Sequence, residues 1–505
     1  MDILLLNVPS ISLVYPPAAP SLLKGVCEQA GFLATVKDFN LTLFNNLHDA
    51  DQINRIANYF TIRSNNITIE DQVILDEWYK DCIAKVLECQ PKFLGISVFT
   101  FECQRATEEL VERLRPVYSG KIIVGGAGLS TTGIASGKND FGTRLKDQGL
   151  VDFFIRGEGE NALVNILREE NNLISGINND NYVQITNLDG IAFPNYDDII
   201  DLPYKYSNNI VQLPVTTSRG CVRACTFCDI HAFWKKYTYR SGESVASEMI
   251  HHYEKYGVTH FFFTDSLING SLKSFRDLYT KINEYYAENN LGDRFFHWGG
   301  QWIVRTPNQL KPKDYQLAAK AGMNGLAMGI ESLSESVRDH MKKGFSNSDL
   351  DYTLEQFREN ELNCYFLIIA GYPTETEDNF VESLEMFTKY QGYAIDGTIF
   401  GVNLGGTLSI DEGTPLHQNG TALGLEFSTE TGNENLFGLD WINEKNPSLT
   451  LLERCKRRVL MQELLMNLGY TVWNGDHQLT RLRESYDKIA RNSYNRPYTP
   501  NTQSV

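Results

Sequence analysis

The chain has 505 residues, more than one hydrophobic core usually holds, so we expect two or three domains. Its composition, with 42% hydrophobic and 22% charged residues, is typical of a globular protein. The formal net charge of −17 argues against a broad nucleic-acid surface, because the phosphate backbone would be repelled. No apolar run approaches the roughly 18 residues needed to cross a bilayer, and the opening residues lack the basic flank of a signal peptide. The sequence therefore predicts a cytoplasmic protein without a membrane span.

The first 170 residues alternate short apolar runs with helical stretches. The apolar runs predict strands at 3–8, 33–39, 93–98, 122–124 and 152–155. Continuous apolar strands separated by helices are typical of a parallel, doubly wound, Rossmann-like α/β sheet. Ligands of such sheets bind beyond the carboxyl ends of the strands, where Gly125, Gly126 and Gly157 fall. We therefore expect a ligand-binding domain over residues 1–170 and a polar linker over 171–208.

A second strand–helix rhythm covers residues 209–420. It predicts strands at 211–216, 260–265, 295–303, 325–331, 364–371 and 397–404. Six such βα units favour a partial (β/α)6 TIM-like barrel. From 421 to 505 the strand signal fades, which predicts a small, mostly helical C-terminal region, and its last residues, about 15 of them, have a disordered composition.

Two charged features in the second half of the chain carry further predictions. Arg454, Lys456, Arg457 and Arg458 concentrate positive charge, which is interpreted as a solvated helix face, with a binding patch as the alternative. Glu375 stands just before a predicted helix and is expected to cap it.

The cysteines are clustered at one place only. Nine are present, and three of them, Cys221, Cys225 and Cys228, lie on one short loop after the first barrel strand. Three thiolates can bind three irons of a 4Fe–4S cluster and leave the fourth iron open to an outside chelator. A zinc site completed by His231, or a redox disulfide pair, is the alternative.

The CxxxCxxC spacing in this position resembles the radical S-adenosylmethionine (SAM) superfamily, and the likeness extends over 211–420. The resemblance implies that the amino and carboxylate groups of SAM bind the open iron. It also implies that an electron, from a donor such as flavodoxin or ferredoxin, cleaves SAM to a 5′-deoxyadenosyl radical. The barrel would supply position and exclude water.

The same resemblance assigns cofactor roles to five further residues. Phe227 would pack beside the cluster and the adenine, while Glu331 and Ser332, in Gly-Ile-Glu-Ser, would face the ribose and carboxylate of SAM. Asp265 would meet the methionine amino group, although this chain lacks the usual Gly-Gly-Glu there. Arg305 would pair with the methionine carboxylate. The structural alternatives are a helix N-cap for Ser332 and a surface position for Arg305.

The first domain resembles the cobalamin-binding domain that precedes many radical SAM barrels. The likeness lies in Tyr15-Pro16-Pro17, Gly125-Gly126 and the 156–160 segment Arg-Gly-Glu-Gly-Glu. It implies a corrin site that includes Ser97, Gly125, Gly126, Gly157 and Glu158, with an ordinary strand-end serine as the alternative for Ser97. The turn at 38–42 lacks the Asp-x-His-x-x-Gly motif. Cobalamin would then bind without a protein imidazole, or the domain would be vestigial.

These features predict a radical SAM enzyme that performs cobalamin-dependent methylation of an unactivated centre in a small-molecule or peptide substrate. A radical SAM oxidoreductase or cyclase with a vestigial cobalamin domain is the second interpretation. A non-catalytic iron–sulfur protein is the third. His297 and Gln301, on alternate positions of the third barrel strand, are expected to face the substrate.

Overall fold

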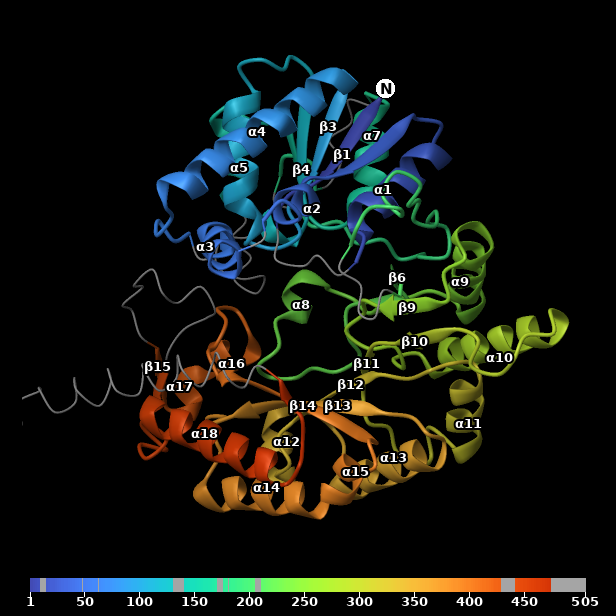
Figure 1. Ribbon diagram of the computed structural model, residues 1–505. Coiled ribbons are helices and arrows are strands. Elements are labelled where there is room, and N and C mark those ends of the chain that lie inside the picture. Colours follow the sequence, from blue (N-terminus) through green and yellow to red (C-terminus); the bar gives the residue numbers. More distant parts are fainter. Residues whose placement is uncertain are drawn as a thin grey trace, which may run out of the picture.

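The computed structural model describes nine stretches of the chain: 1–9, 15–47, 49–61, 63–129, 140–169, 176–179, 181–204, 210–427 and 441–473. Within them the chain forms two α/β units, one above the other in Figure 1. No helix in these stretches is long and apolar enough to cross a membrane.

The first unit is built on a five-stranded parallel sheet. Its strands are β1 (Ile3–Asn7), β2 (Ala34–Asp38), β3 (Phe93–Ser97), β4 (Lys121–Gly125) and β5 (Phe153–Ile155). They lie in the order β2-β1-β3-β4-β5, and every pair is parallel. The predicted doubly wound sheet is thereby confirmed. The strand order reverses between β1 and β3, which is where such sheets open a crevice for ligands.

Helices cover both faces of this sheet, because the strands are apolar on both sides. On one face, α1 (Ala18–Gln29) and α7 (Gly159–Leu167) pack against side chains such as Ile3 and Leu5. On the other face lie α3 (Ala50–Thr61), α4 (Ile69–Cys89), α5 (Cys103–Leu114) and α6 (Asp140–Asp147), with α2 (Phe39–Phe44) at the end of β2. The carboxyl edge of the sheet is left facing the second unit (Figure 1).

The second unit is a partial barrel of parallel strands. One group contains β6 (Gln212–Val215), β9 (His260–Phe263) and β10 (His297–Gly299); the other contains β11 (Gln301–Trp302), β12 (Leu326–Glu331), β13 (Cys364–Ala370), β14 (Ile399–Thr407) and β17 (Val472–Trp473). All six predicted strands are present, which confirms the barrel. The third is split at Gly300, where an added Cβ would come within 2.9 Å of the Phe263 main chain.

The barrel helices follow their strands in sequence and lie on its outer side. They are α9 (Gly242–Tyr256), α10 (Leu272–Glu288), α11 (Pro312–Lys320), α12 (Glu335–Met341), α13 (Asn347–Glu359), α14 (Glu377–Lys389) and α15 (Gln391–Ile395). Alternate strand residues such as Phe261, Trp298 and Phe366 join the core beneath these helices. The residues between them therefore face the inside of the barrel.

The C-terminal region is mostly helical where it is described, as the sequence predicts, and it also contains short strands. Besides α16 (Pro415–Gln418), α17 (Gly420–Leu423) and α18 (Leu451–Asn467), it contains an antiparallel pair, β15 (Leu425–Phe427) with β16 (Trp441–Asn443), and β17 extends the barrel sheet beside β14. These strands are only two or three residues long, too short for a periodic pattern to show. The segment predicted to be disordered lies outside the described residues.

The basic cluster on α18 is buried, so its interpretation as a solvated face is wrong for three of its four members. Arg454 donates to the carbonyls of Leu408 and Trp441, and Arg458 to those of Leu404 and Gly405. Only Lys456 is largely exposed, with 56% of its side chain accessible. The Arg454 and Arg458 guanidinium groups attach α18 to the end of β14, to Leu408 just after it and to β16.

Arg457 explains why Glu375 does not cap the next helix, as the sequence suggested. Its guanidinium lies 3.0 Å from the Glu375 carboxylate, and both side chains are almost fully buried. The N-cap of α14 is Thr376, whose hydroxyl accepts the N–H of Asn379. A capping carboxylate and a buried ion pair cannot be told apart from sequence spacing.

Part of the predicted linker is packed into the core, although other residues of the segment are exposed. Tyr196 and Ile199 are buried in the core that contains residues of both units. Tyr196 donates to the Pro214 carbonyl of β6, and Asp198 accepts from Lys24 of α1 at 2.6 Å. This segment therefore holds the sheet and the barrel against each other.

Candidate active site: a cysteine loop beside an interdomain cavity

The loop that carries the three cysteines begins at the carboxyl end of β6. Asp265, just after β9, accepts the N–H of Thr217 at 2.8 Å and that of Ser218 at 2.9 Å, and also the Thr217 hydroxyl. Burial raises the pKa of this carboxyl to about 7, although those hydrogen bonds act to lower it. Both oxygens are thus engaged by the chain ahead of Cys221, which places Asp265 as a support of the cysteine loop.

The cysteine thiols lie on the turn between β7 (Ser218–Arg219) and α8 (Ile230–Phe233). Cys225 is buried, and Cys221 and Cys228 are half-buried. Burial raises the pKa of the Cys225 thiol, and that of Cys228 to about 12. The turn is fixed to the opposite side of the barrel, because the Thr226 N–H donates to the Met341 carbonyl and its hydroxyl lies 2.7 Å from that of Tyr372.

The ligand set suits a cluster better than a single metal ion. Among the described residues, no three His, Cys, Asp or Glu side chains converge closely enough to hold one ion. His231 points a ring nitrogen at the carbonyl of Arg223. In a 4Fe–4S cubane each cysteine sulfur binds a different iron, so the protein ligands stand farther apart than those around a single zinc ion. Three cysteines on one supported turn therefore fit a 4Fe–4S cluster.

A buried ion pair borders the cysteine turn. Lys343 Nζ lies 3.1 Å from Glu331 Oε1, and it stands 5.9 Å from the centre of the Phe227 ring. Burial opposes the charge on Lys343, but Glu331 and Cys225 raise the pKa of its ammonium group above the ordinary value. Glu331 has φ of 64°, a left-handed conformation that is unusual for a non-glycine residue. The structure thus brings Phe227 and Glu331 together and adds Lys343, which the sequence reasoning missed.

Ser332 and Arg305 are both buried, and the structural alternatives considered for them are wrong. The residue at the N-cap of α12 is Ser334, and the Ser332 hydroxyl accepts its N–H at 3.2 Å. Arg305 donates to the carbonyls of Asn269 and Gly270, while its Nε has no hydrogen-bond partner. Burial lowers the pKa of this guanidinium. Neither side chain is therefore a surface or capping group.

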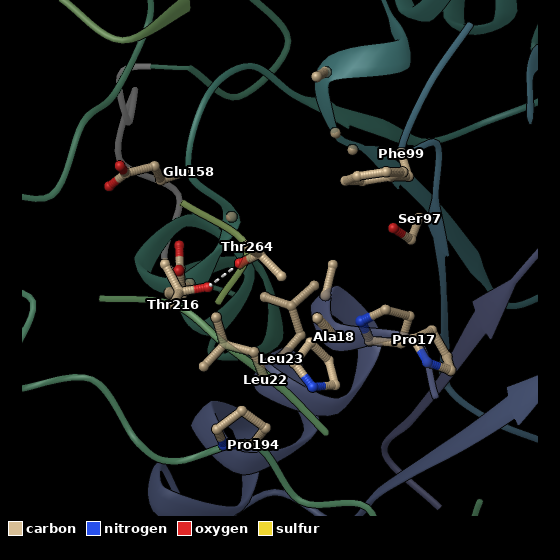
Figure 2. A pocket seen from close by; sticks show the side chains of 18 of the residues that line it. Pro17, Ala18, Leu22, Leu23, Ser97, Phe99, Glu158, Pro194, Thr216 and Thr264 are labelled. Carbon is tan, nitrogen blue, oxygen red and sulfur yellow. Dashed lines mark hydrogen bonds between the residues drawn. The ribbon is translucent and has the colours of Figure 1, made fainter. Parts of the chain in front are cut away.

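A cavity of about 610 Å³ lies between the carboxyl edge of the first sheet and the barrel. It is lined by all five residues predicted for the corrin site: Ser97, Gly125, Gly126, Gly157 and Glu158. Figure 2 shows Ser97 and Phe99 on one side, with Thr216 and Thr264 of the barrel across from them. These two threonine hydroxyls are 3.0 Å apart. Gly220, which precedes Cys221, also lines the cavity, so the cysteine loop forms part of its wall.

The cavity wall on the first domain is mostly main chain and apolar side chains. Gly126 has φ of 118°, and a Cβ there would clash with the Val98 carbonyl. Phe99 is 64% exposed and was not predicted. No histidine occurs among the residues that line the cavity, and Asp38, which opens the turn at 38–42, is used to cap α2. The cavity therefore suits a large, largely apolar ligand that needs no imidazole from these residues.

The inside of the barrel carries the two residues predicted to face the substrate. His297 and Gln301 are exposed there, while the alternating Trp298 and Trp302 are buried in the outer core. The His297 ring stacks on that of His260, with centroids 4.3 Å apart and planes 20° apart. This pairing was not predicted, because it joins two strands that are 37 residues apart (297 − 260) in the chain.

Comparison with known proteins defines the class. Residues 215–387 match the family model of the radical SAM superfamily, so the chain contains a radical SAM domain, as its cysteine motif predicts. A magnesium-protoporphyrin IX monomethyl ester cyclase (anaerobic) of Synechocystis sp. is 22% identical over 268 residues, 49% of this chain and 50% of the cyclase. An uncharacterized methyltransferase of Pyrococcus horikoshii is 28% identical over 262 residues, 48% of this chain and 54% of that protein. The chain spans about half the length of these curated relatives.

Two solved structures share the arrangement of both units. The cobalamin-dependent SAM radical enzyme OxsB, with aqua-cobalamin and SAM bound, has a TM-score of 0.65 and 16% identity, covering 97% of this chain and 71% of OxsB. The radical SAM methyltransferase TsrM of Kitasatospora setae, with cobalamin and a [4Fe-4S] cluster bound, has a TM-score of 0.61 and 17% identity, covering 98% of this chain and 100% of TsrM. The chain therefore has the two-unit fold that these two structures share.

Proposed function

We propose that this protein is a radical SAM enzyme that uses cobalamin to methylate an unactivated centre of a small-molecule or peptide substrate. The observation that carries the proposal is the shared wall: Ser218, Arg219 and Gly220, which lead directly into the three cysteines, also line the cavity between the two units. When bound, the cluster with SAM supplies a 5′-deoxyadenosyl radical and cobalamin supplies a methyl group. The cluster with SAM and the cobalamin would then both lie next to the interior of the barrel.

The residues of the chain take the following roles in this proposal. Cys221, Cys225 and Cys228 hold the cluster, and Asp265 supports their loop. Phe227, Glu331, Ser332 and Arg305 surround SAM, and Lys343 keeps Glu331 in place through the buried ion pair. Arg305 fits such a role because its Nε is buried and unpartnered, so that an anionic group would satisfy it.

The cavity fits a corrin for three reasons. Its volume of about 610 Å³ falls in the range of cofactor sites, it opens at the switch point of a parallel sheet, and its floor of glycines lets a flat ring approach the main chain. Ser97, Gly125, Gly126, Gly157 and Glu158 would contact the corrin or its side chains. We place the substrate inside the barrel, where His260, His297 and Gln301 offer neutral hydrogen-bonding groups.

A second candidate is radical cyclisation or oxidation, favoured by the similarity to a cyclase. In that case the cavity would hold no corrin during turnover. Either reaction needs an electron donor, such as flavodoxin or ferredoxin, to reduce the cluster.

The test is anaerobic reconstitution with iron, sulfide and cobalamin, followed by corrin and cluster spectra and measurement of 5′-deoxyadenosine after addition of reductant. Retained corrin together with 5′-deoxyadenosine is expected. Cleavage without retained corrin would favour the second candidate, and no nucleoside product would refute both. Cys225→Ala is expected to abolish the cluster absorption, with Cys364→Ala, a buried cysteine of β13 away from the loop, as the control.

A further inference from the structure

One barrel arginine is held by the cavity wall of the other domain. Arg219 stands two residues before Cys221, and its Nη1 lies 3.1 Å from Glu158 Oε2. Its Nη2 donates to Glu160, at the start of α7. The side chain is about 10% exposed, and the carboxylates are buried more deeply. The chain that leads into the cysteine loop is thus attached to the first domain by a buried ion triad.

This triad belongs to the cavity wall, and its hydrogen bonding is incomplete. Glu158, Glu160 and Arg219 all line the cavity. Glu158 Oε2 accepts the Ile185 N–H and lies near Arg219. Glu158 Oε1, in a residue only 4% exposed, and Arg219 Nη1 are both buried without a hydrogen-bond partner. A buried acceptor and a buried donor left unpaired are costly, so a small shift of the two side chains that pairs them would be favourable.

The link from Arg219 to the first cysteine is short and tightly packed. Gly220, between them, has φ of 83°, and an added Cβ would lie 2.9 Å from the Lys236 carbonyl. The Trp234 ring covers the guanidinium at 5.8 Å. If the ion pairs between Arg219 and the two carboxylates change, Cys221 is therefore expected to move as well, because the packed segment between these residues has little room to adjust.

We propose that Arg219 is a joint that couples occupancy of the cavity to the cysteine loop. The cavity ligand is a corrin-sized molecule that contacts the part of the wall formed by Glu158, Glu160 and Arg219. This contact changes how the two carboxylates hold Arg219, and it shifts the position and electrostatic surroundings of Cys221. Arg219 is a positioning residue, and this inference rests on the proposed binding of cobalamin and the cluster.

Thermodynamic linkage makes the joint measurable without turnover, because coupling between two binding sites is reciprocal. The dissociation constant of hydroxocobalamin is measured for the full chain with and without its reconstituted cluster. The electron paramagnetic resonance (EPR) spectrum of the reduced cluster is recorded with and without cobalamin. We expect the dissociation constant to differ by about fivefold or more, and the spectrum to change when cobalamin is added.

Arg219→Lys keeps the charge but cannot span both carboxylates, so both effects are expected to shrink towards none. Glu160→Gln weakens the ion pair with Arg219 from the side of the first domain and leaves the cysteine loop unaltered. It is also expected to reduce both effects. Arg276→Lys is the matched control: Arg276 binds Asp314 through two nitrogens, at 2.9 and 3.1 Å, outside the cavity lining. It is expected to keep the full coupling.

The outcomes separate the two proposals. If both cofactors bind but the cobalamin affinity and the cluster spectrum are independent of each other, the joint is refuted while the proposed function stands. Full coupling in both Arg219→Lys and Glu160→Gln would also refute it. If the chain binds no cobalamin with or without its cluster, the proposed function is refuted, and so is the joint that rests on it.

Discussion

Replacing Asp265 by Asn is expected to loosen the cysteine loop. The Asp265 carboxylate accepts two main-chain N–H groups and one hydroxyl ahead of Cys221. Asn offers a single acceptor oxygen and turns an NH2 group towards the remaining donors. One buried N–H left unpaired costs about 1–3 kcal/mol. With an unfolding entropy of about 2.1 cal/mol/K per residue, a loss of about 2 kcal/mol lowers the melting temperature of a chain this long by about 2 °C, if it unfolds cooperatively.

Iron and sulfide content after anaerobic reconstitution, measured beside thermal unfolding, tests this reasoning. Asp265→Asn is expected to hold clearly less cluster than the unchanged chain. Asp198→Asn is the control, since Asp198 accepts from Lys24 and from the Val36 N–H far from the cysteines. It is expected to lose stability but to keep its iron. A full cluster content in Asp265→Asn, or an equal loss in both variants, would refute the role assigned to Asp265.

Three further predictions concern other buried groups. Burial raises the pKa of Glu158 from the ordinary value of 4.5 to about 7. Between these two pH values the folded protein keeps the proton on Glu158, whereas the unfolded chain has lost it. The free energy of unfolding therefore falls as the pH rises from about 4.5 to about 7. This loss amounts to at most about 3 kcal/mol over that pH range, and Glu158→Gln is expected to remove it. A variant whose unfolding free energy depends on pH in the same way as that of the unchanged chain would contradict this. Gly126→Ala is expected to abolish corrin retention, because its Cβ clashes with main chain, whereas Gly149→Ala, also at positive φ but in open space, should retain corrin in the same spectral assay. Arg457→Met leaves the buried Glu375 carboxylate unpaired and is expected to lower the free energy of unfolding by about 3–5 kcal/mol. The control Lys456→Met, at an exposed position, should lower it by less than about 0.5 kcal/mol. Equal denaturation midpoints for the two variants would show that the Arg457 ion pair is not stabilising.

The sequence was sufficient to predict the strands, because buried parallel strands are apolar over their whole length. Each strand of the first sheet is found within about two residues of its predicted bounds. The three cysteines could be grouped because they lie within one short segment of the chain. The charged residues were predicted less well. Arg454, Arg457 and Arg458 were assigned to solvent because local patterns carry no information on partners from distant segments. These partners are main-chain carbonyls of β14 and β16 for Arg454 and Arg458, and the Glu375 carboxylate for Arg457. Lys343 was missed for the same reason, since its partner Glu331 belongs to another element.

The two supports of the cysteine loop come from different parts of the chain. Asp265 holds Thr217 and Ser218 from within the barrel, while Glu158 and Glu160 hold the next residue, Arg219, from the first domain. Three consecutive residues ahead of Gly220 are therefore fixed by carboxylates on opposite sides. A barrel alone could supply only the first of these supports. It follows that removing the first domain should impair the placement of Cys221, even if every cysteine and every SAM-facing residue of the barrel were kept.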